Sequence, residues 1–411
     1  MPGLTSFFRD PLYRNSLFIM LNTGLVSLFN YVFWLLAGKV TSPEQVGLAT
    51  AAISASMMIA AISRLGMDDS ITRFLPKSKD RGGFVNALIA IMLLATAVVL
   101  AGFMMWLPGI SPALQFIRQG QYALQFVVLV FLMSVCNMQG TTLVASRRAD
   151  LALLEYALLF LRIPLLFITG ALGITGIFLA TDVTYLVMMA VGFVFLYRMG
   201  ITRDLHADFG QARKTMRYSL SNYMALILYT APYTLIPILV VNVVGASQQA
   251  YYYAAYSIAA FLLLVPDAIV ASMFVEGSHE RPLRATAFKS LRLALAILVP
   301  MVLAAAFFGD DLLLLFSPAH SAAAYELLLL LATSSLFYAV VEVYFTVVQV
   351  RKNLAMLNFV RLSVTGLTLG LGYVLLQRQG LIGIGYAWLL SCVIVSAFSS
   401  WMMLASKKTW Q

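Results

Sequence analysis

Residues 47–106 read GLATAAISASMMIAAISRLGMDDSITRFLPKSKDRGGFVNALIAIMLLATAVVLAGFMMW. Two apolar stretches, at about 47–66 and 84–106, flank a short polar gap rich in basic residues that ends at Arg81. Each stretch has about the 20 residues that a helix needs to cross the hydrocarbon core of a bilayer. This segment therefore predicts two membrane-spanning helices joined by a basic loop.

The rest of the chain repeats this pattern. Of its 411 residues, 61% are hydrophobic and 11% are charged, and the mean hydropathy is +0.89. A soluble domain carries about a quarter charged residues, so the composition indicates a lipid environment. We predict an all-α polytopic membrane protein with 12 transmembrane helices, at about 16–38, 47–66, 84–106, 121–146, 151–172, 174–197, 218–244, 250–273, 286–308, 322–349, 354–376 and 381–404.

The positive charges are distributed unevenly among the gaps between these stretches. All but four of the 27 Lys and Arg residues fall in alternate gaps; the exceptions are Lys39, Arg118, Arg162 and Arg378. Short loops rich in Lys and Arg stay in the cytoplasm. We therefore predict a multi-pass protein of the cell (plasma or inner) membrane with cytoplasmic N- and C-termini. The net charge of +10 follows from the same bias and predicts no nucleic-acid partner.

The most polar interior stretch, at about residues 198–217, separates six apolar stretches from six others. This division predicts two six-helix bundles, residues 1–200 and 201–411. An even number of spans gives both halves the same orientation, so we expect a parallel repeat with a pseudo-twofold axis along the membrane normal. Ser42-Pro-Glu-Gln-Val-Gly and Ala246-Ser-Gln-Gln-Ala-Tyr, which lead into the second and eighth stretches, give weak support to such a repeat.

Charged residues also lie inside or at the edges of apolar stretches, where a charge is costly unless it faces a cavity or a partner. Arg162 lies 11 residues before Gly173 and Asp182 lies 9 residues after it. A turn at Gly173 would place the two charges within ~3 Å of each other in depth. The same arithmetic predicts three acid–base pairs at matching depth: Arg162 with Asp182, Asp267 with Arg292, and Glu342 with Arg361.

Two interpretations of these pairs stay open. In the first they are structural, because paired charges neutralise each other and fix helix register. In the second a carboxylate titrates or binds a cation during transport, and the ion-coupling candidates are Asp182, Asp267 and Glu342. Arg162 lies near the middle of the bilayer, and a guanidinium binds phosphate by charge and planar shape. It therefore suits an anionic head group as well as a simple pairing with Asp182.

Tyrosines gather on the seventh and eighth stretches. Tyr229 and Tyr233 lie on the seventh, and Tyr256 belongs to a run of tyrosines that opens the eighth on the outer side. An interfacial aromatic belt explains such a cluster. Alternatively, these three rings line a cavity and stack on the faces of sugars.

Signals of catalysis are missing from the sequence. His206, His279 and His320 are not paired at a metal-ligand spacing, and there is no Walker A motif. Asp68-Asp69 lies at the inner interface, where a metal-dependent glycosyl- or phosphotransferase would bind its metal, but it lacks supporting ligands. We therefore predict no enzymatic activity, no bound metal and no cofactor.

Four local motifs are distinctive: Thr41-Ser-Pro-Glu-Gln-Val-Gly-Leu-Ala, Ser63-Arg-Leu-Gly-Met and Thr72-Arg-Phe-Leu-Pro in the first half, and the stretch from Ala246 to Gly277 in the second. They resemble those of the bacterial and archaeal polysaccharide flippases of the multidrug/oligosaccharidyl-lipid/polysaccharide exporter superfamily. The span count and the division into six plus six extend the resemblance over the whole chain.

The resemblance implies two six-helix bundles around a cavity that opens alternately to the two faces of the membrane. Its implied partners are a polyprenyl-(pyro)phosphate-linked oligosaccharide, membrane lipids and a polysaccharide polymerase or ligase. Arg162, Arg64 and Arg292 would then bind the phosphate, and Tyr229, Tyr233 and Tyr256 the sugars. Three energy sources for transport stay open: a H⁺ gradient, a Na⁺ gradient or the membrane potential.

We therefore expect a flippase that moves this lipid-linked oligosaccharide from the cytoplasmic to the outer leaflet for cell-surface polysaccharide biosynthesis. The main alternative is a cation-coupled exporter of drugs or metabolites with the same fold. An Arg-lined cavity with a lateral opening would favour the flippase, and an acidic interior without accessible Arg would favour the exporter. A third class, a membrane-embedded transferase, has only Asp68-Asp69 in its support.

Overall fold

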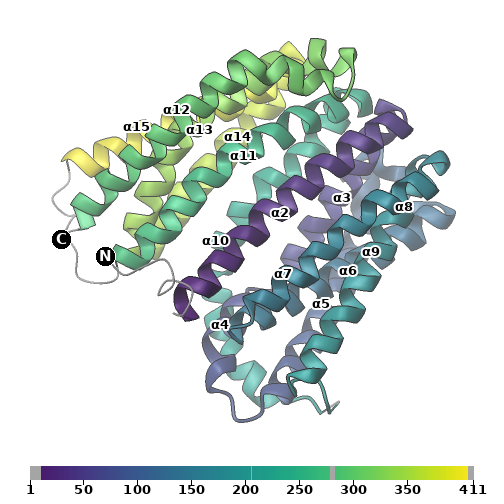
Figure 1. Cartoon of the computed structure of the whole chain (residues 1–411), viewed down its shortest axis with the longest axis vertical. Helices are drawn as coiled ribbons and strands as arrows, with labels where there is room; N and C mark the ends of the chain where they lie inside the picture. Colours follow the sequence, from purple (N-terminus) through teal and green to yellow (C-terminus); the bar gives the residue numbers. More distant parts are fainter. Residues whose placement is uncertain (1–10, 205, 278–282, 406–411) are drawn as a thin grey trace. The chain divides into compact units, whose positions relative to one another are not determined.

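The computed structural model describes residues 11–204, 206–277 and 283–405. Within these ranges all regular structure is helical, and twelve helical segments are long and apolar enough to cross a membrane. The predicted all-α fold with 12 membrane-spanning helices is confirmed (Figure 1). Both chain ends lie outside the described residues, so the orientation of the termini stays a prediction.

The chain divides into two compact units. Unit 1 comprises Met1–Gln45 and Ala51–Thr230, and unit 2 comprises Val46–Thr50 and Ala231–Gln411. Two helices contribute to both units, α3 (Pro43–Ser63) and α10 (Phe209–Val243). The predicted boundary at residues 200 and 201 counts membrane spans rather than packing contacts, and it stays a prediction.

Unit 1 is built mainly from α2, most of α3, and α4 to α9. α6 packs most extensively on α9, and α2 packs on α7. Met67, Leu88, Met138 and Leu196 are fully buried in a core that joins α4, α5, α6 and α9. The helices not yet bounded are α2 (Pro11–Val40), α4 (Met67–Phe74), α5 (Arg81–Ile110), α6 (Gly120–Ala145), α7 (Ala149–Ala157), α8 (Arg162–Thr169) and α9 (Ile174–Arg198).

The fifth membrane span of the chain is not a continuous α-helix. A 3₁₀ segment, η3 (Leu158–Leu161), separates α7 from α8, and a second one, η4 (Gly170–Leu172), follows α8. Because a 3₁₀-helix has about three residues per turn, such a segment rotates the following side chains away from the positions of a regular α-helix. The two remaining 3₁₀ segments, η1 (Leu75–Lys77) and η2 (Pro112–Arg118), lie beside α5.

Unit 2 is organised around α13, which packs against α11, α12 and α15, while α14 packs on α15. Leu298, Ala332 and Ala339 belong to a buried cluster between α12 and α13. The small alanine side chains let these helices approach closely, as packing in lipid requires. The bounds are α11 (Ala246–Gly277), α12 (Leu283–Leu314), α13 (Pro318–Val350), α14 (Leu354–Gln379) and α15 (Ile382–Ala405).

Within unit 2, residues 46–50 of α3 lie against the first turn of α11. A side chain on Gly47 would clash with the carbonyl oxygen of Ala246. Three residues further along each segment, Gln249 Nε2 donates to Thr50 Oγ1 at 3.3 Å. Glycine is the residue that allows such a close approach of two helix starts.

The helix starts are specified locally. Ser42 caps α3 in a capping box with Gln45, and Pro43 occupies the first turn, where its missing N–H is not needed. Asp80 accepts a hydrogen bond from the N–H of Gly83 at 2.8 Å and so caps α5. Ser317 caps α13 in the same way, through the N–H of His320.

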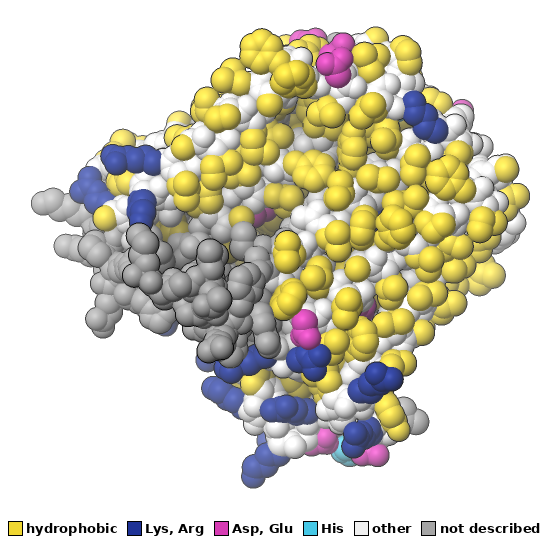
Figure 2. Space-filling view, in the orientation of Figure 1, with side chains coloured by type: hydrophobic (Ala, Val, Ile, Leu, Met, Phe, Trp, Pro, Cys, Tyr) yellow, Lys and Arg dark blue, Asp and Glu magenta, His cyan; other side chains and the backbone are white. Residues whose placement is uncertain are grey.

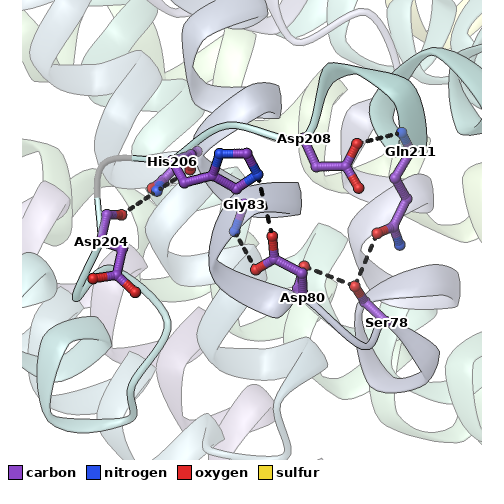
Figure 3. Close-up of polar contacts among 8 residues, drawn as sticks. Ser78, Asp80, Gly83, Asp204, His206, Asp208 and Gln211 are labelled. Carbon is purple, nitrogen blue, oxygen red and sulfur yellow. Dashed lines mark hydrogen bonds and ion pairs between the residues drawn. The ribbon is translucent and has the colours of Figure 1, made fainter.

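The connector between α9 and α10 is tied to the start of α5 (Figure 3). Asn86 Nδ2 donates to the carbonyl oxygens of Asp204 and His206, at 2.7 and 2.9 Å. His206 Nε2 lies 3.7 Å from Asp80 Oδ2. This end of unit 1 carries many Lys and Arg side chains, whereas hydrophobic side chains cover much of the helical surface (Figure 2). That surface matches a bundle surrounded by lipid.

Candidate functional site

One of the three predicted acid–base pairs is formed. In unit 2, Arg361 of α14 donates through Nη1 and Nη2 to the two carboxylate oxygens of Glu342 on α13, the second bond measuring 3.0 Å. Glu342 is 2% exposed and Arg361 is 8% exposed. The ring centre of Phe345 lies 3.7 Å from the guanidinium carbon. A bidentate pair of this kind satisfies the carboxylate within the membrane span.

The predicted pair between Arg162 and Asp182 is wrong. Arg162 is buried at the start of α8, where its Nη2 donates to Asn30 Oδ1 at 2.9 Å. Its guanidinium also lies 4.7 Å from the ring centre of Phe33. The prediction assumed regular helical geometry, but η3 directly precedes Arg162 and changes the direction in which its side chain points.

Asp182 lies on the buried face of α9 and is 8% exposed. Its Oδ1 has no hydrogen-bond partner among the described residues. An unpaired carboxylate is costly within a membrane span. The position therefore fits an ion-coupling residue better than a structural ion pair, and the role of Asp182 stays a prediction.

The predicted pair between Asp267 and Arg292 is also wrong. Asp267 is half-buried in α11, whereas Arg292 lies on the exposed side of α12 and forms no ion pair within the described ranges. Equal depth on two neighbouring helices does not ensure that their side chains face each other. The assignment of Arg292 as a phosphate ligand stays a prediction.

Arg64, the third arginine predicted to bind phosphate, forms an ion pair at the end of α3. Its Nη1 lies 3.0 Å from Asp68 Oδ2, and Thr141 donates to the other oxygen of the same carboxylate at 3.0 Å. The contacts described for Arg64, Arg162 and Arg292 have no partner in common. The structure thus does not gather the three predicted phosphate ligands within one unit.

Two of the three tyrosines predicted to bind sugar come together in unit 2. The ring centres of Tyr233 and Tyr256 are 6.3 Å apart, and that of Trp388 lies 5.8 Å from Tyr233. Tyr252 stacks on Tyr256 with an interplanar angle of 8°. Tyr252, Tyr256 and Trp388 line a small, mostly apolar pocket with aliphatic neighbours. Tyr229 lies one turn before Tyr233 on α10, in the part of that helix that belongs to unit 1.

A buried polar cluster in unit 1 was not predicted from the sequence. Glu155 of α7 and Gln139 of α6 are both fully buried, and both approach Gly192 of α9. Glu155 lies six residues after the start of α7 at Ala149, and Gln139 and Gly192 lie six residues before the ends of α6 and α9 at Ala145 and Arg198. This equal spacing, about 9 Å along each helix from that end, was the one signal in the sequence that the three residues could meet.

None of the described residues forms a group of three or more His, Cys, Asp or Glu side chains that could hold a metal ion. His206 lies in the connector of Figure 3 and His320 in the first turn of α13, whereas His279 lies outside the described residues. A pocket beside the connector is lined by Lys79, Arg81 and Asp204 among others. Its charges have both signs, so it does not favour a particular ligand.

The arrangement of the helices matches solved transporters over nearly the whole chain. A multidrug resistance MATE family transporter of the MOP superfamily, in its inward-facing conformation, superposes with a TM-score of 0.70 at 14% identity, covering 94% of this chain and 96% of that one. The fold is that of the MATE transporters. The match extends to both units, and the solved MATE structures are transporters rather than enzymes.

Two further structures show the range of proteins with this MATE fold. A mutant of the Vibrio cholerae MATE transporter VcmN has a TM-score of 0.67 at 14% identity, with 99% of each chain covered. A MOP superfamily transporter from Pyrococcus furiosus, described as having a binding pocket of reverse polarity, has a TM-score of 0.64 at 16% identity, covering 97% and 96%. No family model and no curated relative matches the sequence.

Proposed function

We propose that this protein is a cation-coupled exporter of small organic compounds that works by alternating access. The observation that carries the proposal is the polarity of the interior of unit 1. Asp182 and Glu155 are buried there with oxygens that have no hydrogen-bond partner among the described residues. The arginines of the same unit that were predicted to bind phosphate are engaged by Asn30 and Asp68.

The aromatic pocket of unit 2 supports the same function. Tyr252, Tyr256 and Trp388 line a void of only about 10 Å³ among aliphatic side chains, so an organic compound would contact these ring faces only after the surrounding helices move apart. Aromatic faces attract organic cations, by about 0.5–2 kcal/mol per contact depending on desolvation. Tyr233, whose ring lies beside both Tyr256 and Trp388, extends this surface. We therefore propose an apolar or cationic organic compound as the exported substrate.

Among the three ion-coupling candidates, the surroundings favour Asp182. A carboxylate that gains and loses a cation during transport needs a ground state without a permanent positive partner. Glu342 has such a partner in Arg361, and the structural interpretation suits it. Asp267 is half-buried on α11 and stays a second candidate. Coupling to a H⁺ or Na⁺ gradient would supply the energy, with no cofactor.

A lipid-linked oligosaccharide flippase of the cell membrane is the second candidate function. Arg162 favours it, because this residue is buried within a membrane span and a guanidinium binds phosphate well. The local sequence motifs favour it too. A fold does not fix the charge of its substrate. For this function the partners would be the lipid-linked oligosaccharide and a polymerase or ligase of the polysaccharide.

The test is transport in proteoliposomes that contain the purified protein and a fluorescent organic cation. We expect dye movement driven by an imposed H⁺ or Na⁺ gradient, and a loss of about tenfold or more in Asp182→Asn, in line with typical coupling free energies. Asp311→Asn, which changes an exposed aspartate of α12, is the matched control and should transport normally.

The same proteoliposomes distinguish the second candidate. A fluorescent oligosaccharide linked to a polyprenyl pyrophosphate is added, and its exposure in each leaflet is followed with and without Arg162→Ala. Movement of this lipid that depends on Arg162, together with no gradient-driven movement of the dye, would contradict the exporter proposal.

A further inference from the structure

Glu155 is a buried carboxyl group for which the described part of the chain supplies no hydrogen-bond partner. It lies on α7, is fully buried, and neither Oε1 nor Oε2 has a hydrogen-bond partner among the described residues. Carrying a full charge in such a place costs several kcal/mol. A carboxyl group that binds a proton avoids this cost and gains a hydrogen-bond donor.

An acceptor for that donor faces Glu155 from the neighbouring helix. Gln139 on α6 is fully buried, and its Nε2 donates to the carbonyl oxygen of Met189 at 3.0 Å. With the amide held in this orientation, its Oε1 has no hydrogen-bond partner among the described residues. A Cβ atom placed on Gly192 would lie 2.6 Å from Gln139 Oε1 and 2.9 Å from Glu155 Oε1. The two oxygens therefore flank the same point in space.

Two acceptor oxygens in this arrangement need a hydrogen-bond donor or a cation between or beside them. An ionised carboxylate next to an amide oxygen would be repelled, whereas a protonated one can donate to it, and a bond of this kind contributes about 1 kcal/mol. Sodium is normally held by more oxygen ligands than this cluster supplies. The chemistry of the cluster therefore favours a proton.

The glycines of α6 and α9 make room for the cluster. Gly192 has no side chain to separate Gln139 from Glu155. One residue after Gln139, a Cβ on Gly140 would lie 2.8 Å from the ring of Tyr156. The absence of side chains at these two positions lets α7 lie close to both α6 and α9, so that Glu155 reaches its neighbours.

Few charged or titratable groups face Glu155 from the surrounding helices. Cys136 of α6 and Tyr156 of α7 lie within electrostatic range of its carboxyl group. Tyr185 of α9 and Arg64 at the end of α3 face Tyr156. Arg64 is the one cation in this set, and Asp68 already binds it. From α2, the apolar Val26 and Phe29 pack against the same buried cluster as Tyr156.

We propose that Glu155, with Gln139 Oε1 as its hydrogen-bond acceptor, is a proton-binding site in unit 1. The site lies on different helical turns from Asp182, which precedes Gly192 by ten residues on α9. A role for this proton in transport rests on the proposed export function, whereas the binding of the proton does not. The export function and the proton site can therefore be disproved separately.

The test is infrared spectroscopy of the full-length protein in lipid, which detects the carbonyl stretch of protonated carboxyl groups. At neutral pH the wild type should show a carboxylic-acid band that is lost in Glu155→Gln. The band should persist in Glu326→Gln, a matched control that changes an exposed glutamate on α13. Gln139→Leu should keep the band but move it to higher frequency, because the acceptor is lost.

A second measurement covers the case in which Glu155→Gln does not fold. A hydrophobic carbodiimide reacts with protonated carboxyl groups in apolar surroundings, and mass spectrometry of the wild type should place the adduct on Glu155. Identical infrared spectra of wild type and Glu155→Gln, no adduct on Glu155, or loss of the acid band on adding Na⁺ at constant pH would each overturn the proton site. If the band is present but no substrate is exported, the proposed function fails and the proton site stands.

Discussion

Two fully buried glutamates, one in each unit, have opposite surroundings. Glu342 on α13 receives two hydrogen bonds from Arg361 of α14. Glu155 on α7 receives none from the described residues and faces an amide oxygen instead. The same side chain is thus expected to be ionised in unit 2 and protonated in unit 1. Burial alone does not decide the charge of a carboxyl group; the donors and acceptors around it do.

The different surroundings of the two glutamates also indicate different roles. A carboxylate held by a bidentate arginine changes its charge only if the pair is broken, so Glu342 suits a fixed joint between α13 and α14. A carboxyl group without a cationic partner can exchange its proton at a smaller cost. We therefore expect mutations around Glu342 to act on stability, and mutations around Glu155 to act on proton binding.

The largest effect is expected when the pair in unit 2 is broken. Arg361→Met leaves Glu342 buried without its cation, which should lower the free energy of unfolding by about 3–5 kcal/mol. Chemical unfolding in detergent measures this loss. The double variant Glu342→Leu/Arg361→Met should recover most of it, because a well-packed apolar pair often replaces a buried ion pair without loss. A loss below about 1 kcal/mol in Arg361→Met would show that the pair does not hold a buried charge.

The sequence predicted the fold better than the sites, for a physical reason. Apolar length and the position of Lys and Arg are properties of whole segments, and they predicted twelve spans. The direction of a side chain depends on every turn before it, so η3 was enough to separate Arg162 from Asp182. The pair of Glu342 and Arg361 was predicted correctly because α13 and α14 are regular helices joined by a short turn. The cluster of Glu155 with Gln139 was not predicted because Gln139 is uncharged.

A smaller effect is expected from filling the space between Gln139 and Glu155. Gly192→Ala would place a methyl group against both side-chain oxygens, and such overpacking typically costs about 1–3 kcal/mol. Gly102→Ala is the matched control, since no atom lies within 4 Å of the added Cβ on α5. The control should be neutral or stabilising by up to about 1 kcal/mol, because alanine favours the helix. Equal stability of the two variants would contradict the close approach at Gly192.

The smallest effect is expected from an ion pair that water can reach. Arg148 Nε lies 2.9 Å from Asp150 Oδ1, and the two side chains are 42% and 37% exposed. Asp150→Asn should therefore change the free energy of unfolding by about 1 kcal/mol or less. Comparison with Arg361→Met in the same assay isolates the contribution of burial. A loss as large as that of Arg361→Met would mean that exposure does not explain the difference between the pairs.

A comparison of Glu155→Gln with Glu342→Gln in one unfolding assay tests whether Glu155 is neutral and Glu342 is ionised. Both substitutions replace a carboxyl group by an amide of the same shape. If Glu155 is protonated, the amide replaces a neutral group, and stability should change by about 1 kcal/mol or less. Glu342→Gln leaves the guanidinium of Arg361 without its carboxylate and should lose about 3–5 kcal/mol. Equal losses in the two variants, or a larger loss in Glu155→Gln, would contradict the assignment of a neutral Glu155 and an ionised Glu342.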